Sequence, residues 1–197
     1  MGQIMSENIV DASSLHAIEK TISANAGRGK KHIYLFLDFD GVINLFIDTD
    51  RDDAVEIMRK RAETMEFADR ECVRNLDQLL SDHPEIDVII SSSWRLKGVE
   101  YCRQYLKKAG LNRVSQITDV IEHKEELHRS QEIANYLLQH PDYTDYMIFD
   151  DQSMSVFGDR WVYTHPYHGY DAERDAWVRQ NLLHERHAID GKTVLSS

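Results

Sequence analysis

Five short apolar runs recur along the chain from residue 32 onward, and helix-like stretches fill the intervals between them. Several runs are wholly apolar, which is typical of strands that are buried on both faces of a sheet. The runs are 32–37, 86–90, 113–117, 146–149 and 160–163. Strands that alternate with helices in this way favour an α/β fold, a doubly wound parallel five-stranded sheet with helices on both faces.

The stretches between these runs place apolar side chains three and four residues apart, as an amphipathic helix does. Such stripes run through residues 72–80, 99–109 and 133–138. Pro84 follows the first stripe and Gly110 ends the second, and both residue types are common where a helix stops. We therefore expect at least three helices packed against the sheet.

The chain divides into a short N-terminal arm and one domain. Leu15, Ile18 and Ile22 share one helical face, and "NAGRGKK" then reads as a flexible basic joint. We expect residues 1–30 to form a partly mobile arm and residues 31–197 to form a single domain of ordinary size.

Composition and charge narrow the classes of partner. The 197 residues carry a formal net charge of −11, so we expect no extended nucleic-acid-binding face, although a nucleic-acid end stays a candidate substrate. No apolar run approaches the roughly 20 residues of a membrane helix, and no signal-peptide pattern opens the chain. We therefore expect a cytoplasmic protein with no membrane partner. Cys72 and Cys102 are too few for a disulfide framework and are expected to be buried free thiols.

Oxygen-bearing side chains follow four of the predicted strands. They are Asp38 and Asp40 after the first strand, Ser91 after the second, Asp150 and Asp151 after the fourth, and Thr164 after the fifth. Ligands of such sheets bind beyond the carboxyl ends of the strands, so these groups are expected to converge. Two carboxylates about 5 Å apart repel by roughly 3 kcal/mol at an effective dielectric near 20. A hard cation would offset this repulsion, and Mg²⁺ is the natural candidate because it accepts carboxylates and keeps waters for a phosphate.

The spacing of the first two acids adds a chemical prediction. Residues two apart on an extended segment point the same way, so Asp38 and Asp40 can face one reacting atom. Gly41 allows the backbone to turn and to approach that atom closely. One carboxylate is then placed to attack as a nucleophile and the other to hand a proton to the leaving group.

With these features on view, "LDFDGVI" resembles the first motif of the haloacid dehalogenase (HAD) superfamily of aspartate-nucleophile phosphatases. The other landmarks follow in the family's order: Ser91 after "DVII", Arg129 in "HRSQEI", and the acidic "MIFDD". The resemblance covers about residues 32–185. Within the superfamily, "SSSWR", "RSQEI", "FDD" and "THPYHGYD" are similar to a subgroup found in bacterial and phage RNA-repair proteins.

The resemblance implies a mechanism and a metal. Asp38 would become an aspartyl-phosphate, and Asp40 would protonate the leaving oxygen and then activate water. Mg²⁺ would be held by the Asp38 side chain, the Asp40 backbone carbonyl and Asp150, with Asp151 ligating through water or lying behind the ligands. An acid at position 40 favours phosphate hydrolysis, or phosphate transfer between hydroxyls, over carbon–halogen cleavage.

For the residues that bind the phosphoryl group and the substrate, the sequence leaves more than one candidate. Ser91 would hydrogen-bond a phosphoryl oxygen, and Ser92 or Ser93 are alternatives for that role. Arg129 would neutralise the phosphoryl charge, and Lys124 is its rival. We also place Gly41, Ser92, Arg95 and Thr164 among the substrate contacts. Arg95 has a second reading as the ion-pair partner of a carboxylate in the cluster, and Trp94 is expected to be a packing residue.

The segment between Asn44 and Pro84 holds two helix-like stretches, of which the first has an apolar face. It is too short for a full cap domain and suits at most a partial lid over an open site. An open site suits a large substrate, such as a nucleic-acid end or a phosphoprotein. The leading prediction is a Mg²⁺-dependent phosphatase that acts on a nucleotide or polynucleotide end. The alternatives are a phosphotransferase or phosphomutase, and a non-catalytic module that binds a phosphorylated ligand.

Overall fold

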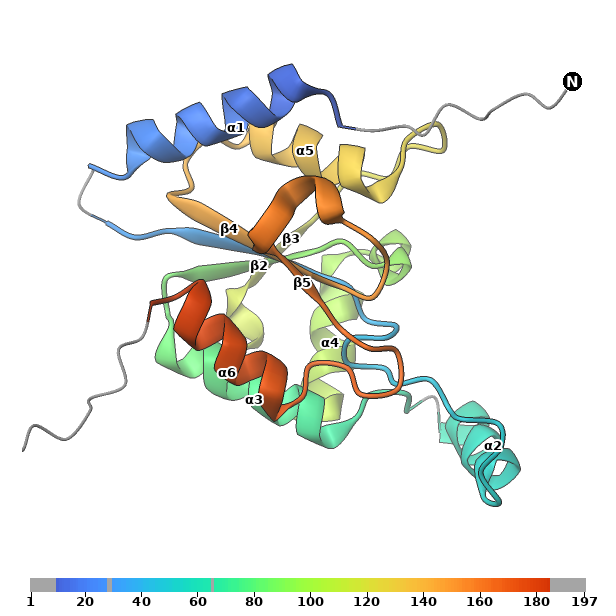
Figure 1. Ribbon diagram of the computed structural model, residues 1–197. Helices are drawn as coiled ribbons and strands as arrows, with labels where there is room; N and C mark the ends of the chain where they lie inside the picture. The colour runs from blue at the N-terminus through green and yellow to red at the C-terminus, as the bar shows by residue number, and fades with distance from the viewer. Residues whose placement is uncertain (1–9, 28–29, 65, 185–197) are drawn as a thin grey trace, which may run out of the picture.

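A computed structural model describes residues 10–27, 30–64 and 66–184, which form a five-stranded parallel sheet flanked by helices (Figure 1). The strand order is β3-β2-β1-β4-β5, which confirms the predicted doubly wound α/β fold. The strands are β1 Ile33–Leu37, β2 Ile86–Ile90, β3 Ile117–Val120, β4 Asp145–Asp150 and β5 Trp161–Tyr163. The α-helices are α1 Ala12–Asn25, α2 Ala54–Thr64, α3 Arg70–Asp82, α4 Val99–Ala109, α5 Arg129–Gln139 and α6 Ala172–Asn181. Short 3₁₀ turns are η1 Ser93–Lys97, η2 Val114–Gln116 and η3 Ser155–Arg160.

The sheet separates two hydrophobic cores. Helices α3, α4 and α6 cover one face and α1 and α5 cover the other (Figure 1). The central strand β1 is buried along its whole length because it supplies both cores. Its odd-numbered side chains, such as Leu35, pack toward α3 and α4, and its even-numbered ones, such as Phe36, pack toward α1 and α5. This alternation accounts for the uninterrupted apolar run in the sequence.

The third strand begins later than predicted. We expected residues 113–117 to be extended, but they enter a 3₁₀ turn, η2, and the strand occupies Ile117–Val120. Val114 and Ile117 pack into the same core. Residues three apart share a face in a helical turn but not in a strand, so this packing favours the turn. The Gln116 side chain fixes the end of this turn, since its amide donates to the main-chain carbonyls of His83 and Ile86 (3.1 and 3.0 Å).

The described part of the predicted arm is a layer of the domain. In α1, Ile18 is 1% exposed and packs in the core beneath α5. The Asn25 side-chain amide donates to the carbonyls of Pro141 and Tyr143, both at 2.8 Å, which ties the end of α1 to the start of β4. Residues 10–27 thus contribute an apolar face to one core, while residues 1–9, 28 and 29 of the expected arm lie outside the described residues.

The segment between Asn44 and Pro84 contains one helix that packs on the core and one that projects from the domain. Helix α3 packs on the sheet, and its Asp69 side chain caps its first turn. Helix α2 lies away from the sheet (Figure 1), and Ala54 is its only buried residue among those described. This segment thus contributes one projecting helix, α2, beside the carboxyl ends of the strands. In the described residues, no helix combines the length and the apolar character needed to cross a membrane.

Candidate active site

Three carboxylates lie together at the ends of β1 and β4. The ladder between these strands continues one residue past β1, because the Asp38 N–H donates to the Phe149 carbonyl at 3.0 Å. Asp38 therefore stands level with Asp150. One carboxylate oxygen from each of Asp38, Asp150 and Asp151 lies within 4.8 Å of the others. Asp38 and Asp150 are almost fully buried, at 2% and 0% exposure.

One cation joins this cluster from the first turn of α5. Arg129 Nη1 donates to Asp38 Oδ2 at 2.6 Å and to Asp150 Oδ2 at 2.7 Å. Burial alone would lower the pKa of Arg129, but the two carboxylates raise it above its ordinary value. Arg129 therefore stays charged and offsets part of the repulsion between the acids.

The cluster keeps an excess of negative charge that suits a divalent cation. Burial, followed by the charge of Asp38, raises the pKa of Asp150 to about 6, and the same two causes raise the pKa of Asp151. Three carboxylates thus face one guanidinium. An all-oxygen donor set with this charge fits Mg²⁺.

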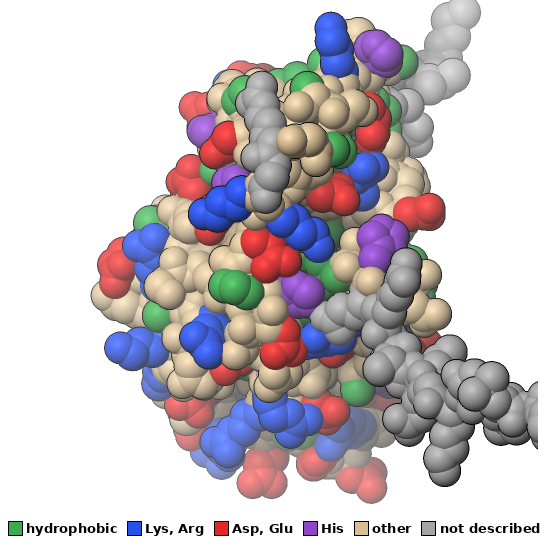
Figure 2. Space-filling view, turned by 90° about the vertical axis from the view of Figure 1, so that its left-hand side faces the viewer, with side chains coloured by type: hydrophobic (Ala, Val, Ile, Leu, Met, Phe, Trp, Pro, Cys, Tyr) green, Lys and Arg blue, Asp and Glu red, His purple; other side chains and the backbone are tan. Residues whose placement is uncertain are grey.

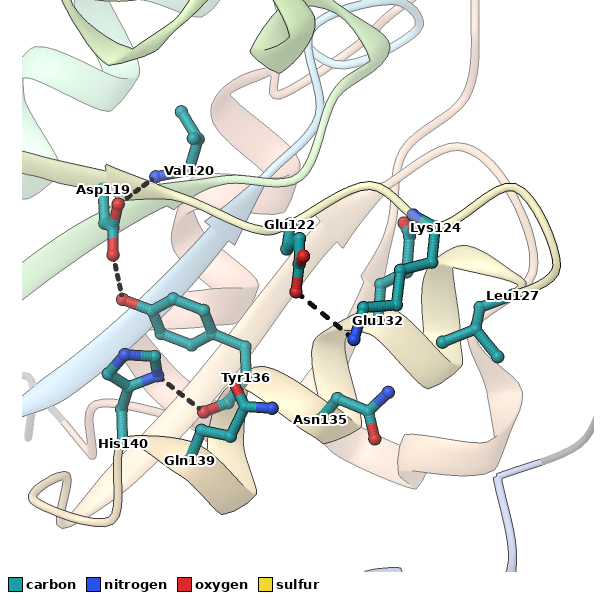
Figure 3. Close-up of a pocket in the computed structure, with 10 residues that line it drawn as sticks. All are labelled: Asp119, Val120, Glu122, Lys124, Leu127, Glu132, Asn135, Tyr136, Gln139 and His140. Atoms are coloured by element: carbon teal, nitrogen blue, oxygen red, sulfur yellow. Dashed lines mark hydrogen bonds and ion pairs between the residues drawn. The ribbon is translucent and has the colours of Figure 1, made fainter.

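Lys124, the rival of Arg129, lies elsewhere. Its ammonium pairs with Glu122 at 3.3 Å, and both residues line a cavity of about 120 Å³ beside α5 (Figure 3). The other polar groups of that cavity include Asp119 and Tyr136, whose hydroxyl donates to Asp119 at 3.0 Å. Between the two candidates, the structure places Arg129 at the acid cluster.

Asp40 stands apart from the three clustered acids and is held by its own hydrogen bonds. The Trp94 indole N–H donates to Asp40 Oδ2 at 3.1 Å, and the Asn44 amide donates to Oδ1 at 2.9 Å. The Tyr105 hydroxyl in turn donates to Asn44 Oδ1 at 2.6 Å. The orientation of the Asp40 carboxylate is thus set by two donors, one of which is itself anchored.

This network was not predicted. Trp94 does pack, with its ring centroid 4.5 Å from that of Tyr105, but its N–H also reaches Asp40. Asn44 could have been predicted from the sequence, because it closes the tight turn that starts after Asp38 and it forms a bridge back to Asp40. No local pattern points to Trp94 or Tyr105, since both come from segments distant in the sequence.

Gly41 and Thr164 shape the turn after Asp40. Gly41 has φ +78°, and a Cβ atom there would lie 2.4 Å from Asp151 Oδ2. A side chain at position 41 would therefore displace an acid of the cluster. Thr164 was predicted to contact the substrate, but it is fully buried and its hydroxyl donates to the Gly41 carbonyl at 2.9 Å. Its observed contact is with the turn.

The three serines in the loop after β2 differ in burial and in hydrogen bonding. Ser91 is fully buried, and among the described residues its hydroxyl has no hydrogen-bond partner, so it is free to bind a ligand oxygen. Ser92 is also buried, and its hydroxyl accepts from the Trp94 N–H at 3.4 Å. Ser93 is exposed at the start of η1. Ser91 is thus the best placed of the three.

Arg95 has a partner that the sequence did not suggest. It is 7% exposed and donates to Glu132 Oε2 at 2.6 Å and to the Ser91 carbonyl at 2.5 Å. Glu132 lies one turn after Arg129 on α5, so this ion pair joins the serine loop to the helix that carries the cation. Arg95 therefore pairs with Glu132 and not with a carboxylate of the cluster. It also lines a cavity beside Arg129, so its contact with the substrate stays a prediction.

Comparisons with known proteins agree with this geometry. A family model described as the HAD domain in Swiss Army Knife RNA repair proteins matches residues 34–174, which is well over half of the chain. Neither the curated proteins nor the solved structures contain a match to the chain. The match spans β1 to the start of α6 and so includes every acid of the cluster, Asp40 and Arg129. The chain therefore belongs to the family of HAD domains of Swiss Army Knife RNA repair proteins.

Proposed function

We propose that this protein is a Mg²⁺-dependent phosphomonoester hydrolase that works through an aspartyl-phosphate on Asp38. The observation that carries the proposal is the division of the acids at the sheet edge. Asp38, Asp150 and Asp151 share one site with Arg129, while Asp40 is held separately by Trp94 and Asn44. A nucleophile beside charge-compensating groups, with a second acid held apart, is what phosphoryl transfer requires.

In the first half-reaction a carboxylate oxygen of Asp38 attacks the phosphorus atom, and the bond from phosphorus to the leaving oxygen breaks. Asp40 gives its proton to that oxygen. In the second half-reaction Asp40 takes a proton from a water molecule, whose oxygen attacks phosphorus. The bond from phosphorus to Asp38 then breaks, and inorganic phosphate leaves.

Three further groups serve the phosphoryl oxygens. Arg129 supplies positive charge next to Asp38. The Ser91 hydroxyl has no hydrogen-bond partner within the described part of the chain and is available to donate to a phosphoryl oxygen. Asp38, Asp150 and the Asp40 main-chain carbonyl, with Asp151 nearby, would hold Mg²⁺. When bound, this ion supplies charge neutralisation for the phosphoryl group.

For the substrate we propose a nucleotide or a phosphorylated nucleic-acid end. The family description refers to RNA repair proteins, and α2 forms no more than a minimal cap. The charge distribution favours recognition of an end over recognition of a long strand. The net charge is −11, and acidic and basic side chains are intermixed on the face seen in Figure 2. This face is the side where the strands begin, away from the acids at their carboxyl ends, so the preference for an end rests on the net charge alone.

Phosphate release with and without metal tests the proposal. With Mg²⁺, we expect release from an aryl phosphate and from some members of a panel of nucleotides and 3′- or 5′-phosphorylated oligonucleotides. Chelation by EDTA should lower the rate by at least about 100-fold, because the acids then lack their counter-ion. Added alcohol that diverts phosphate from water would indicate a phosphotransferase. Tight binding of phosphorylated ligands without any turnover would contradict the enzyme and favour a binding module.

The hydrogen bond from Trp94 to Asp40 makes a separate prediction. Trp94→Phe keeps a ring in the cluster but removes the N–H donor, so Asp40 loses one of its two positioning contacts. We expect kcat for an alkyl phosphate to fall about five- to tenfold, the cost of one hydrogen bond. The loss should be smaller for nitrophenyl phosphate, whose leaving group needs little protonation.

The matched control is Trp177→Phe, because Trp177 lies on α6 and packs at the edge of a core. It should leave kcat for both substrates within about twofold of wild type. Equal losses for the alkyl and the nitrophenyl ester in Trp94→Phe would count against a role in leaving-group protonation.

A further inference from the structure

A cavity of about 680 Å³ opens beside Asp40, and its described lining residues include neither Arg129 nor an acid of the cluster. Its volume is within the range of about 300–1,000 Å³ that is usual for small-molecule pockets. The walls come from the loop after Asp40, from α2 and from the loop after β5. Lining residues include Asp40, Asn44, Phe46, Met58, Arg61 and Tyr167.

The walls are apolar and aromatic where they face solvent. Phe46, Met58 and Tyr167 are 50%, 43% and 47% exposed, which is unusual for large hydrophobic side chains gathered in one place. The Phe46 and Tyr167 rings meet edge to face, with centroids 6.5 Å apart. Such a surface favours a flat aromatic ligand over a polar chain.

Hydrogen bonds hold the walls in place. The Phe46 N–H donates to the Pro166 carbonyl at 2.9 Å, which joins the two loops. Arg61 Nη1 donates to the Leu45 carbonyl at 2.5 Å and so fixes α2 against the first loop. At Gly169, which has φ +62°, a Cβ atom would lie 2.4 Å from the Val42 carbonyl, so the second loop is pressed against the first. The cavity is therefore largely preformed.

The position of Asp40 indicates which part of the substrate lies in the larger cavity. A second cavity, of about 280 Å³, shares no described lining residue with the first and is lined by Arg129 and by the ion pair of Arg95 and Glu132. Arg129 supplies the positive charge there, since Arg95 is paired with Glu132, and this cavity therefore suits phosphoryl oxygens. The leaving oxygen must instead lie by Asp40, and Asp40 lines the larger cavity. Whatever is attached to the leaving oxygen therefore extends toward Phe46 and Tyr167.

We propose that this cavity binds the base of the terminal nucleoside whose phosphate reaches Asp38. The inference rests on the hydrolase proposed above and names the leaving group that it accepts. A base offers a flat π-face to the aromatic walls, and its sugar spans the interval between them and Asp40. Among the described residues that line the cavity, Arg61 is the single Lys or Arg, so one nucleoside fits its chemistry better than a run of phosphates.

The test compares a nucleotide with a phosphate ester that has no ring. The substrates are the 2′-, 3′- and 5′-monophosphates of adenosine and glycerol phosphate, with Mg²⁺ present. In Phe46→Ala and in Tyr167→Ala, we expect kcat/KM for the preferred adenosine phosphate to fall about 5- to 100-fold, as expected for one lost stacking contact. The value for glycerol phosphate should stay within about twofold of wild type. Oligonucleotides with the same terminal phosphate show whether a strand end is accepted as well as a mononucleotide.

Val55→Ala is the matched control, because Val55 lies on α2 and is 76% exposed but does not line the cavity. It should change neither substrate. If both substrates lose activity equally in the Phe46 and Tyr167 variants, or if neither does, the cavity does not bind the base. That result leaves the hydrolase intact.

A binding measurement separates the two proposals. Adenosine, which has no phosphate, is titrated calorimetrically into wild type and Phe46→Ala. Weaker binding in the variant supports the cavity even if no substrate is hydrolysed, in which case the hydrolase proposal alone fails. Equal binding in the two proteins, or none in either, overturns the proposed site.

Discussion

Replacing Asp38 by asparagine is expected to abolish phosphate release, with kcat lowered by at least about 10,000-fold. The amide has nearly the same size and can still accept the Arg129 hydrogen bond, but it cannot attack phosphorus. The variant should nevertheless fold, because it removes one of three crowded acids from a site with a single guanidinium. Phosphate release and thermal unfolding, both measured in the same Mg²⁺ buffer, check this expectation.

Asp50→Asn is a suitable control, since Asp50 is an exposed aspartate in the loop before α2. It should release phosphate at the wild-type rate. A labelled substrate adds direct evidence: wild type should trap phosphate in a hydroxylamine-sensitive form, as an acyl phosphate does, and Asp38→Asn should trap none. Release that persists in the folded Asp38→Asn protein would reject Asp38 as the nucleophile.

Sequence patterns place four of the five strands of the described sheet to within one residue and misplace the edge strand β3. Strands β1, β2 and β4 lie inside the sheet, so both of their faces are largely buried. β1 is a continuous apolar run, β2 is interrupted at Asp87, and β4 is apolar from Tyr146 to Phe149. The edge strand β3 has one fully buried residue, Ile117, which leaves little pattern to distinguish strand from turn. Its start was therefore misplaced.

The same contrast applies to the site. The clustered acids could be predicted because each stands at the end of a strand or directly after it, and the parallel sheet brings the strand ends together. Contacts between side chains from distant parts of the chain could not be predicted. Trp94 meets Asp40 across 54 positions, and Arg95 meets Glu132 across 37. Such contacts depend on how loops and helices pack, which no local spacing encodes.

Removing the Arg129 side chain is expected to lower both stability and activity. In Arg129→Ala, Asp38 and Asp150 stay buried without their shared cation, so the free energy of unfolding in EDTA should fall by about 3–5 kcal/mol. Added Mg²⁺ should stabilise this variant more than it stabilises wild type, because the ion meets acids that no cation offsets. With Mg²⁺, kcat should still fall about 100- to 1,000-fold, since the phosphoryl oxygens lose a fixed positive charge.

Urea unfolding in EDTA and in Mg²⁺, together with phosphate release, measures these effects. Lys124→Ala is the matched control, because Lys124 pairs with Glu122 at a half-exposed position outside the cluster and should change stability by less than about 0.5 kcal/mol. Arg129→Lys tests geometry, since a lysine keeps the charge but cannot present the planar guanidinium. Should Arg129→Ala prove as stable in EDTA as Lys124→Ala, the three carboxylates would not be repelling one another in the folded protein. The case for a cation at this sheet edge would then lose its physical basis.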